Sequence, residues 1–96
     1  MSEAFILEFR GVGAEAYHRV NEILGVDMTA GTGLPPGLAA HTGAATADGL
    51  LVLEVWDSRE AAGEFLSSRL GAALAEAGVP EPSRREWMSL EGSFVR

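Results

Sequence analysis

The sequence predicts one α+β domain whose strands and helices follow the order β-α-β-β-α-β. Two stretches place apolar side chains at helical spacing, and four stretches have strand-like composition. An Asp-Gly pair separates the two central strand-like runs, as in a β-hairpin. This order is that of the ferredoxin-like fold, an antiparallel four-stranded sheet with two helices on one face. The 96 residues fit a single domain, residues 1–96, and leave no room for a second.

The first strand and the first helix are predicted from residue spacing. Phe5–Arg10 alternates, with Phe or Leu at every odd position, as in a half-buried strand. Ala14–Leu24 then carries an apolar stripe at helical spacing that includes Tyr17, and Gly25 is well placed as a C-terminal cap. His18 falls off this stripe and is expected to be a solvent-exposed surface residue.

The second and third strands are predicted to form the hairpin, with Leu38–Thr46 leading out and Leu50–Asp57 returning. Asp48-Gly49 would form a type I′ turn, in which both central residues need positive φ. Before the hairpin, Val26–Gly37 is rich in glycine and proline. Irregular segments of this length are uncommon in small domains and often serve as lids, so we treat this one as a candidate lid.

This turn sets a register in which His41 faces Trp56 and Gly43 faces Glu54. Side chains alternate between the faces of a sheet, so His41, Glu54 and Trp56 are expected to project from one face. A slip by one residue would separate them. We expect the helices to cover the opposite face, which carries Ala40, Thr42, Ala44, Leu51, Leu53 and Val55.

The second helix and the last strand complete the order. Asp57–Glu60 has the composition of a helix N-terminus, and an apolar stripe follows from Ala62 to Ala77. The last strand is predicted over Glu86–Val95 and carries Trp87 on one face.

Two helices can cover only one face of a four-stranded sheet. The uncovered face is predicted to carry Val52, Trp56, Trp87 and one face of the first strand. Monomers rarely expose an apolar patch of this size, so a partner should cover it. A two-fold homodimer, with its sheets opposed around a cavity, satisfies this requirement.

Composition excludes several classes of function. The net charge of −7, from 14 acidic and 7 basic residues, leaves no basic stripe, so we expect no nucleic-acid binding. The chain has no cysteine, which excludes disulfides, thiolate nucleophiles and cysteine-ligated metals. Met1–Glu3 leads directly into a strand-like run, so we expect no signal peptide, no membrane association and a cytoplasmic protein.

The stretch Gly49–Glu60, with the sequence GLLVLEVWDSRE and running into Phe65, resembles the dimeric α/β-barrel superfamily that contains the antibiotic biosynthesis monooxygenases. A strand that ends in Trp, an acidic residue and Ser, followed by a helix with Glu and Phe, is frequent there. With His41 in the second strand, the chain is particularly similar to small actinobacterial members. The resemblance implies a homodimer, assembled as a dimeric α/β barrel, with one ligand cavity per subunit between sheet and helices.

The resemblance also implies a range of activities. Enzymes of this superfamily include cofactor-independent oxygenases of aromatic polyketides and quinols, haem-degrading oxygenases, and lactone isomerases or decarboxylases. The haem-degrading enzymes use an Asn on the first strand, a Trp that ends the third and a His on the second helix. Only Trp56 matches this pattern, so the haem-degrading branch is disfavoured.

His41 and Glu54 are the candidate catalytic residues. A neutral imidazole can act as a general base near pH 7, and a neighbouring carboxylate orients it and stabilises its charged form. Trp56, Tyr17 and Trp87 are the candidate substrate-binding residues, since an aromatic ring can stack on a planar substrate. The same residues also fit a purely structural role, as a polar pair and aromatic anchors in the dimer interface or the core.

Two functional hypotheses follow. The first is a small enzyme, monooxygenase- or isomerase-like, that acts on an aromatic or quinol-type molecule without a metal or an organic cofactor. The second is a non-catalytic small-molecule-binding or interaction module on the same scaffold.

Overall fold

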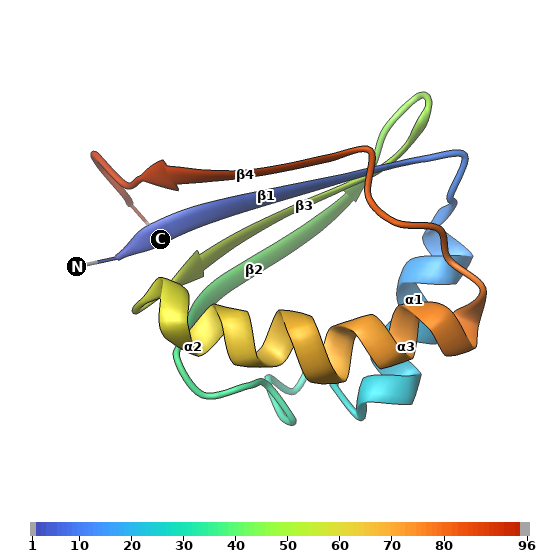
Figure 1. The fold of residues 1–96 in the computed structure, drawn as a ribbon, viewed down its shortest axis with the longest axis horizontal. Helices are drawn as coiled ribbons and strands as arrows, with labels where there is room; N and C mark the ends of the chain where they lie inside the picture. Colours follow the sequence, from blue (N-terminus) through green and yellow to red (C-terminus); the bar gives the residue numbers. More distant parts are fainter. Residues whose placement is uncertain (1, 95–96) are drawn as a thin grey trace.

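The computed structural model describes residues 2–94 and has the predicted order of elements (Figure 1). Four antiparallel strands form one sheet in the order β2-β3-β1-β4. These strands are β1 (Glu3–Arg10), β2 (Leu38–Ala45), β3 (Gly49–Trp56) and β4 (Arg84–Ser89). The helices are α1 (Ala14–Leu24), α2 (Arg59–Glu64), a π-helical segment η1 (Phe65–Leu70) and α3 (Gly71–Ala77).

Both helical parts of the chain lie on the same side of the sheet (Figure 1). The segments α2, η1 and α3 follow one another without a break and form the second predicted helix. Ser58 caps its start, because the side-chain oxygen accepts a hydrogen bond from the backbone N–H of Ala61 at 3.2 Å. Gly78 ends it in the left-handed conformation, as Gly25 ends α1. Within the described residues, no helix is long and apolar enough to cross a membrane.

The last strand is shorter than predicted. It ends at Ser89, and residues 90–94 have no regular structure. Residue 95, where the prediction placed the end of the strand, lies outside the described residues.

The hairpin forms, but its turn differs from the prediction. The backbone N–H of Thr46 donates to the carbonyl of Gly49 at 2.9 Å, so Ala47 and Asp48 are the central residues of the turn. Neither they nor Gly49 has a positive φ, which makes the type I′ prediction wrong. A side chain at position 49 would instead collide with the backbone carbonyl of Phe9 on β1. Glycine is therefore required there for the close approach of β1.

The register of the hairpin is shifted by two residues from the prediction. His41 pairs directly with Glu54, and Gly43 pairs with Val52. Because side chains alternate with a period of two, a shift by two residues keeps the same side chains on the same face. The prediction that His41, Glu54 and Trp56 share one face is therefore consistent with this register.

The predicted choice of the helix-covered face is wrong. Leu50, Val52, Glu54 and Trp56 of β3 are buried under the helices, whereas Leu53 on the other face is 42% exposed. On β1 the buried residues of the core include Phe5, Leu7 and Phe9, and Trp87 stacks on Phe5 with ring centroids 4.3 Å apart. This face carries the large aromatic side chains of β1, β3 and β4, whereas on the other face the apolar side chains of these strands are non-aromatic and β2 contributes Ala40, Thr42 and Ala44, so covering it gains more from the hydrophobic effect. The uncovered face consequently does not carry Val52, Trp56 or Trp87.

Candidate functional site

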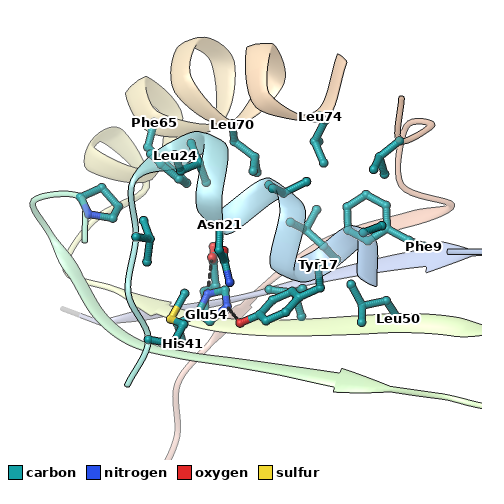
Figure 2. A pocket seen from close by; sticks show the side chains of 18 of the residues that line it. Phe9, Tyr17, Asn21, Leu24, His41, Leu50, Glu54, Phe65, Leu70 and Leu74 are labelled. Carbon is teal, nitrogen blue, oxygen red and sulfur yellow. Dashed lines mark hydrogen bonds and ion pairs between the residues drawn. The ribbon is translucent and has the colours of Figure 1, made fainter. Parts of the chain in front are cut away.

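A cavity of about 60 Å³ lies between the covered face of the sheet and the helices. Its walls come from β1, β2, β3, α1, η1, α3 and the segment 26–37, and they are predominantly aliphatic and aromatic. The polar side chains that line it are Tyr17, Asn21, His41 and Glu54, shown together with the apolar walls in Figure 2. Among residues 2–94, no lysine or arginine lines the cavity. The site thus combines an apolar chamber with a small polar group of side chains.

A chain of hydrogen bonds links three of these polar residues, Tyr17, His41 and Glu54, to the core. The hydroxyl oxygen of Tyr17 lies 2.7 Å from Nε2 of His41, and Nδ1 of His41 lies 2.9 Å from Oε2 of Glu54. The other carboxylate oxygen of Glu54 accepts the indole N–H of Trp56 at 2.9 Å. Glu54 is only 4% exposed and Trp56 is fully buried, so neither group can exchange its partner for bulk water. A buried carboxylate is retained at such a position only when hydrogen bonds satisfy it.

The direction of these hydrogen bonds follows from the chemistry of the acceptor. With Glu54 as a carboxylate, both of its oxygens accept, so Nδ1 of His41 carries the proton that it donates to Glu54. In the neutral imidazole Nε2 is then the acceptor, and the hydroxyl of Tyr17 donates to it. Glu54 therefore holds His41 in the tautomer whose Nε2 lone pair points at Tyr17.

Gly43 provides the space for Tyr17. A Cβ atom at position 43 would lie 2.5 Å from two atoms of the Tyr17 ring and 2.8 Å from its hydroxyl oxygen. The ring also stacks on His41, with centroids 5.8 Å apart and planes inclined by 22°. The Tyr17 ring thus packs directly on β2, and only a glycine at position 43 allows this close contact.

The structure brings together some of the predicted site residues and separates others. His41, Glu54 and Tyr17 line the cavity. Trp56 does not line it, and it contacts the site through its hydrogen bond to Glu54 and by packing against Phe65, with ring centroids 5.8 Å apart. Trp87 lies elsewhere on the covered face, stacked on Phe5 and 5.3 Å beneath the guanidinium of Arg59. His18 is exposed, as predicted.

Two features of the site were not predicted from the sequence. Asn21 lines the cavity, one helical turn after Tyr17, and this i, i+4 spacing is the signal that identifies it. The contact between Tyr17 and His41 has no local signal, because 24 residues separate the two. The sequence predicts Tyr17 on the apolar stripe of the first helix, as a candidate substrate-binding or core residue, and His41 on a strand, but it does not bring the two together.

The segment 26–37 forms one wall of the cavity. Its residues that line the cavity are Val26, Met28, Leu34 and Pro35, and Met28 and Leu34 are also more than one-third exposed. The carboxylate of Asp27 accepts the backbone N–H groups of Thr29 and Ala30, at 2.9 and 3.0 Å. The segment therefore covers the cavity with an ordered turn, and its role as a lid stays a prediction.

The site offers no evident metal centre. Within residues 2–94, no three His, Asp or Glu side chains are grouped so that they could hold a metal ion.

The chain has the fold of the antibiotic biosynthesis monooxygenase-like proteins. A putative antibiotic biosynthesis monooxygenase from Chloroflexus aurantiacus superposes with a TM-score of 0.68 at 20% identity, over 99% of this chain and 98% of that one. SnoaB, a cofactor-independent oxygenase from Streptomyces nogalater, gives a TM-score of 0.65 at 12% identity, over 99% and 98% of the two chains.

A third solved structure of this fold contains a ligand. It is a monooxygenase from Streptomyces coelicolor in complex with nanaomycin D, with a TM-score of 0.59 at 21% identity, over 99% of this chain and 91% of that one. No family model and no curated protein matches the sequence. These likenesses define the fold of the chain.

Proposed function

We propose that this protein is a small cofactor-independent monooxygenase that acts on an aromatic or quinol-type molecule in the cavity between sheet and helices. The observation that carries the proposal is the hydrogen-bonded Tyr17–His41–Glu54 group on the wall of an apolar cavity. A neutral imidazole that is oriented by a carboxylate can accept a proton from a phenol or an activated C–H group. The resulting carbanion can react with dioxygen without a metal in a dry pocket.

The electrostatics of the cavity support a neutral substrate. Its ionisable lining residues are Tyr17, His41 and Glu54, and none of them is a permanent cation. A carboxylate or phosphate group on the substrate would therefore be desolvated beside Glu54 without a counter-ion, which is costly. A neutral ring with a hydroxyl group avoids this cost.

The size of the cavity requires some movement of its walls. Its volume of about 60 Å³ is smaller than the roughly 150 Å³ of an engineered apolar cavity that binds benzene. A neighbouring groove of about 340 Å³ is lined in part by the same residues. The cavity and the groove share Leu7, Phe9, Leu70, Leu74 and Val79. Rotamer changes in the shared side chains, or displacement of the segment 26–37, would admit a ring.

We also propose that the protein is a homodimer formed through the uncovered face of the sheet. The large apolar side chains on this face are Ile6, Leu51, Leu53, Val55 and Met88. At one edge Arg84 and Glu86 form an ion pair at 2.8 Å, and this hydrogen bond to Glu86 raises the pKa of Arg84 above its usual value. An apolar centre beside a polar edge is the usual anatomy of a protein interface.

The catalytic proposal is tested by oxygen uptake with a panel of monocyclic and polycyclic phenols and hydroquinones. We expect His41→Ala to fold and to lose turnover by roughly 10²–10⁴-fold, the usual contribution of a general base. Glu76→Ala is the control, because this residue is exposed on α3 and does not line the cavity, and its turnover should equal that of the wild type.

Three other results would change the assignment. The same rate without oxygen would indicate isomerase chemistry. Ligand binding without turnover in either the wild type or His41→Ala would indicate a non-catalytic binding module. Equal turnover of wild type and His41→Ala would remove His41 from the mechanism.

A further inference from the structure

The two nitrogen atoms of His41 are both engaged. Nδ1 is bound to Glu54, and Nε2, the nitrogen that can accept a proton, is bound to the hydroxyl of Tyr17 at 2.7 Å. The His41 side chain is only 11% exposed. A ligand in the cavity therefore reaches His41 either by displacing Tyr17 or through Tyr17.

Displacement of Tyr17 is opposed by its surroundings. Its ring fills the space above Gly43, stacks on His41 and meets His18 edge-on with centroids 5.6 Å apart. The residue lies within α1, so its backbone is held by the helix. Breaking its hydrogen bond would leave Nε2 of His41 without this partner in a mainly apolar cavity, which carries an energetic cost.

We propose that Tyr17 is the catalytic residue that exchanges a proton with the substrate, and that His41 and Glu54 act through it. In this step the hydroxyl proton of a neutral phenol or hydroquinone moves to the phenolic oxygen of Tyr17. The proton of Tyr17 moves at the same time to Nε2 of His41. The products are a bound phenolate and an imidazolium, whose charge Glu54 stabilises across the 2.9 Å contact. The inference deepens the proposed function and rests on it for the choice of substrate class.

The step requires a defined polarity of the hydrogen-bond chain. Tyr17 must donate to Nε2 of His41, and this requires the proton of the neutral imidazole on Nδ1. Glu54→Gln reverses this polarity. If the amide oxygen accepts the indole N–H of Trp56, the amide nitrogen faces His41 as a donor. His41 must then carry its proton on Nε2, so Tyr17 becomes the acceptor and has no base for its own proton.

The chain is well suited to test this polarity by nuclear magnetic resonance, because it contains two histidines and one tyrosine. In protein with ¹⁵N-labelled histidine, we expect His41 to show the Nδ1–H tautomer at neutral pH, and Tyr17→Phe to shift its Nε2 signal. Glu54→Gln should convert His41 to the Nε2–H tautomer. An Nε2–H tautomer in the wild-type protein would overturn the proposal.

Proton transfer itself is tested with 4-nitrophenol, whose visible absorption reports its ionisation. The experiment is carried out without oxygen, at a pH where the free probe is mostly protonated. We expect the wild type to bind the probe as phenolate. Tyr17→Phe should bind it with similar affinity but lower the ratio of bound phenolate to phenol by roughly tenfold or more, the effect of losing a charge-assisted hydrogen bond. Glu54→Gln should lower the ratio similarly, and Glu76→Gln, which changes an exposed glutamate on α3, should leave it unchanged.

Two results of the 4-nitrophenol experiment would also overturn the proposal. Tyr17→Phe with as much bound phenolate as the wild type would mean that His41 meets the ligand directly. Absence of phenolate in the wild type would mean that the site does not ionise this class of molecule. Because no oxygen is present, the outcome is separate from that of the proposed function. If the wild type forms bound phenolate but consumes no oxygen with any substrate, only the proposed monooxygenase activity is refuted. If Tyr17→Phe consumes oxygen as fast as the wild type, only the proposed role of Tyr17 is refuted.

Discussion

Glu54 is the residue whose removal most directly tests the buried hydrogen-bond chain. Glu54→Ala leaves the indole N–H of fully buried Trp56 and Nδ1 of His41 without their acceptor. An unsatisfied buried donor costs about 1–3 kcal/mol. The cost at Trp56 should be close to the full value, whereas His41, with 11% of its side chain exposed, can regain part of it from water. The variant no longer buries a carboxylate, so the desolvation cost of Glu54 is removed and offsets part of this loss of stability.

Together these effects predict that Glu54→Ala lowers the free energy of unfolding by about 2–4 kcal/mol. For a domain of this size, that corresponds to a fall in Tm of roughly 10–25 °C. The assay is thermal and urea unfolding followed by circular dichroism, at one fixed protein concentration, because dimer formation would change the apparent stability. Glu76→Ala, which removes an exposed glutamate from α3, is the matched control and should change stability by less than about 0.5 kcal/mol.

A double-mutant cycle with Trp56→Phe isolates the Glu54–Trp56 hydrogen bond. In the Trp56→Phe background the donor is already absent, so Glu54→Ala should cost about 1 kcal/mol less than in the wild type. Equal costs in the two backgrounds, or a loss for Glu54→Ala no greater than that for Glu76→Ala, would refute the view that these bonds hold the site together.

Two further substitutions test the packing of the Tyr17 ring against Gly43 and the proposed dimer. Gly43→Ala places a methyl carbon 2.5 Å from the Tyr17 ring, and such overpacking should destabilise the fold by about 1–3 kcal/mol in urea unfolding. Gly63→Ala, in open space on a helix, should be neutral or stabilising, and an equal loss in both variants would contradict this. Leu53→Glu should convert a dimer to a monomer in native mass spectrometry, whereas Ala72→Glu on α3 should not. A wild-type monomer, or a dimer that survives Leu53→Glu, would exclude this interface.

The candidate pair illustrates how much sequence periodicity can predict. The register set by the Asp48-Gly49 turn, together with alternation along each strand, predicts His41 and Glu54 on one face. The prediction is consistent with the observed register because the two registers differ by an even number of residues. The turn was misassigned for a different reason. Asp48-Gly49 matches the local preference for a type I′ turn, but Gly49 is glycine because β1 passes close to it. The sequence preference for a type I′ turn depends on neighbouring residues alone, so it could not predict the contact between Gly49 and β1.

By itself, the sequence determined the order of elements, the faces that side chains share and the candidate pair His41–Glu54, because alternation and helical spacing are local properties of the chain. Tertiary structure alone decided which face the helices cover, since this depends on the total apolar area of strands that are distant in sequence. It also decided that Tyr17 meets His41 over Gly43 and that Trp56 supports Glu54 from the core. These contacts arise only when α1 packs on the sheet, and they convert a candidate pair of residues into a connected site.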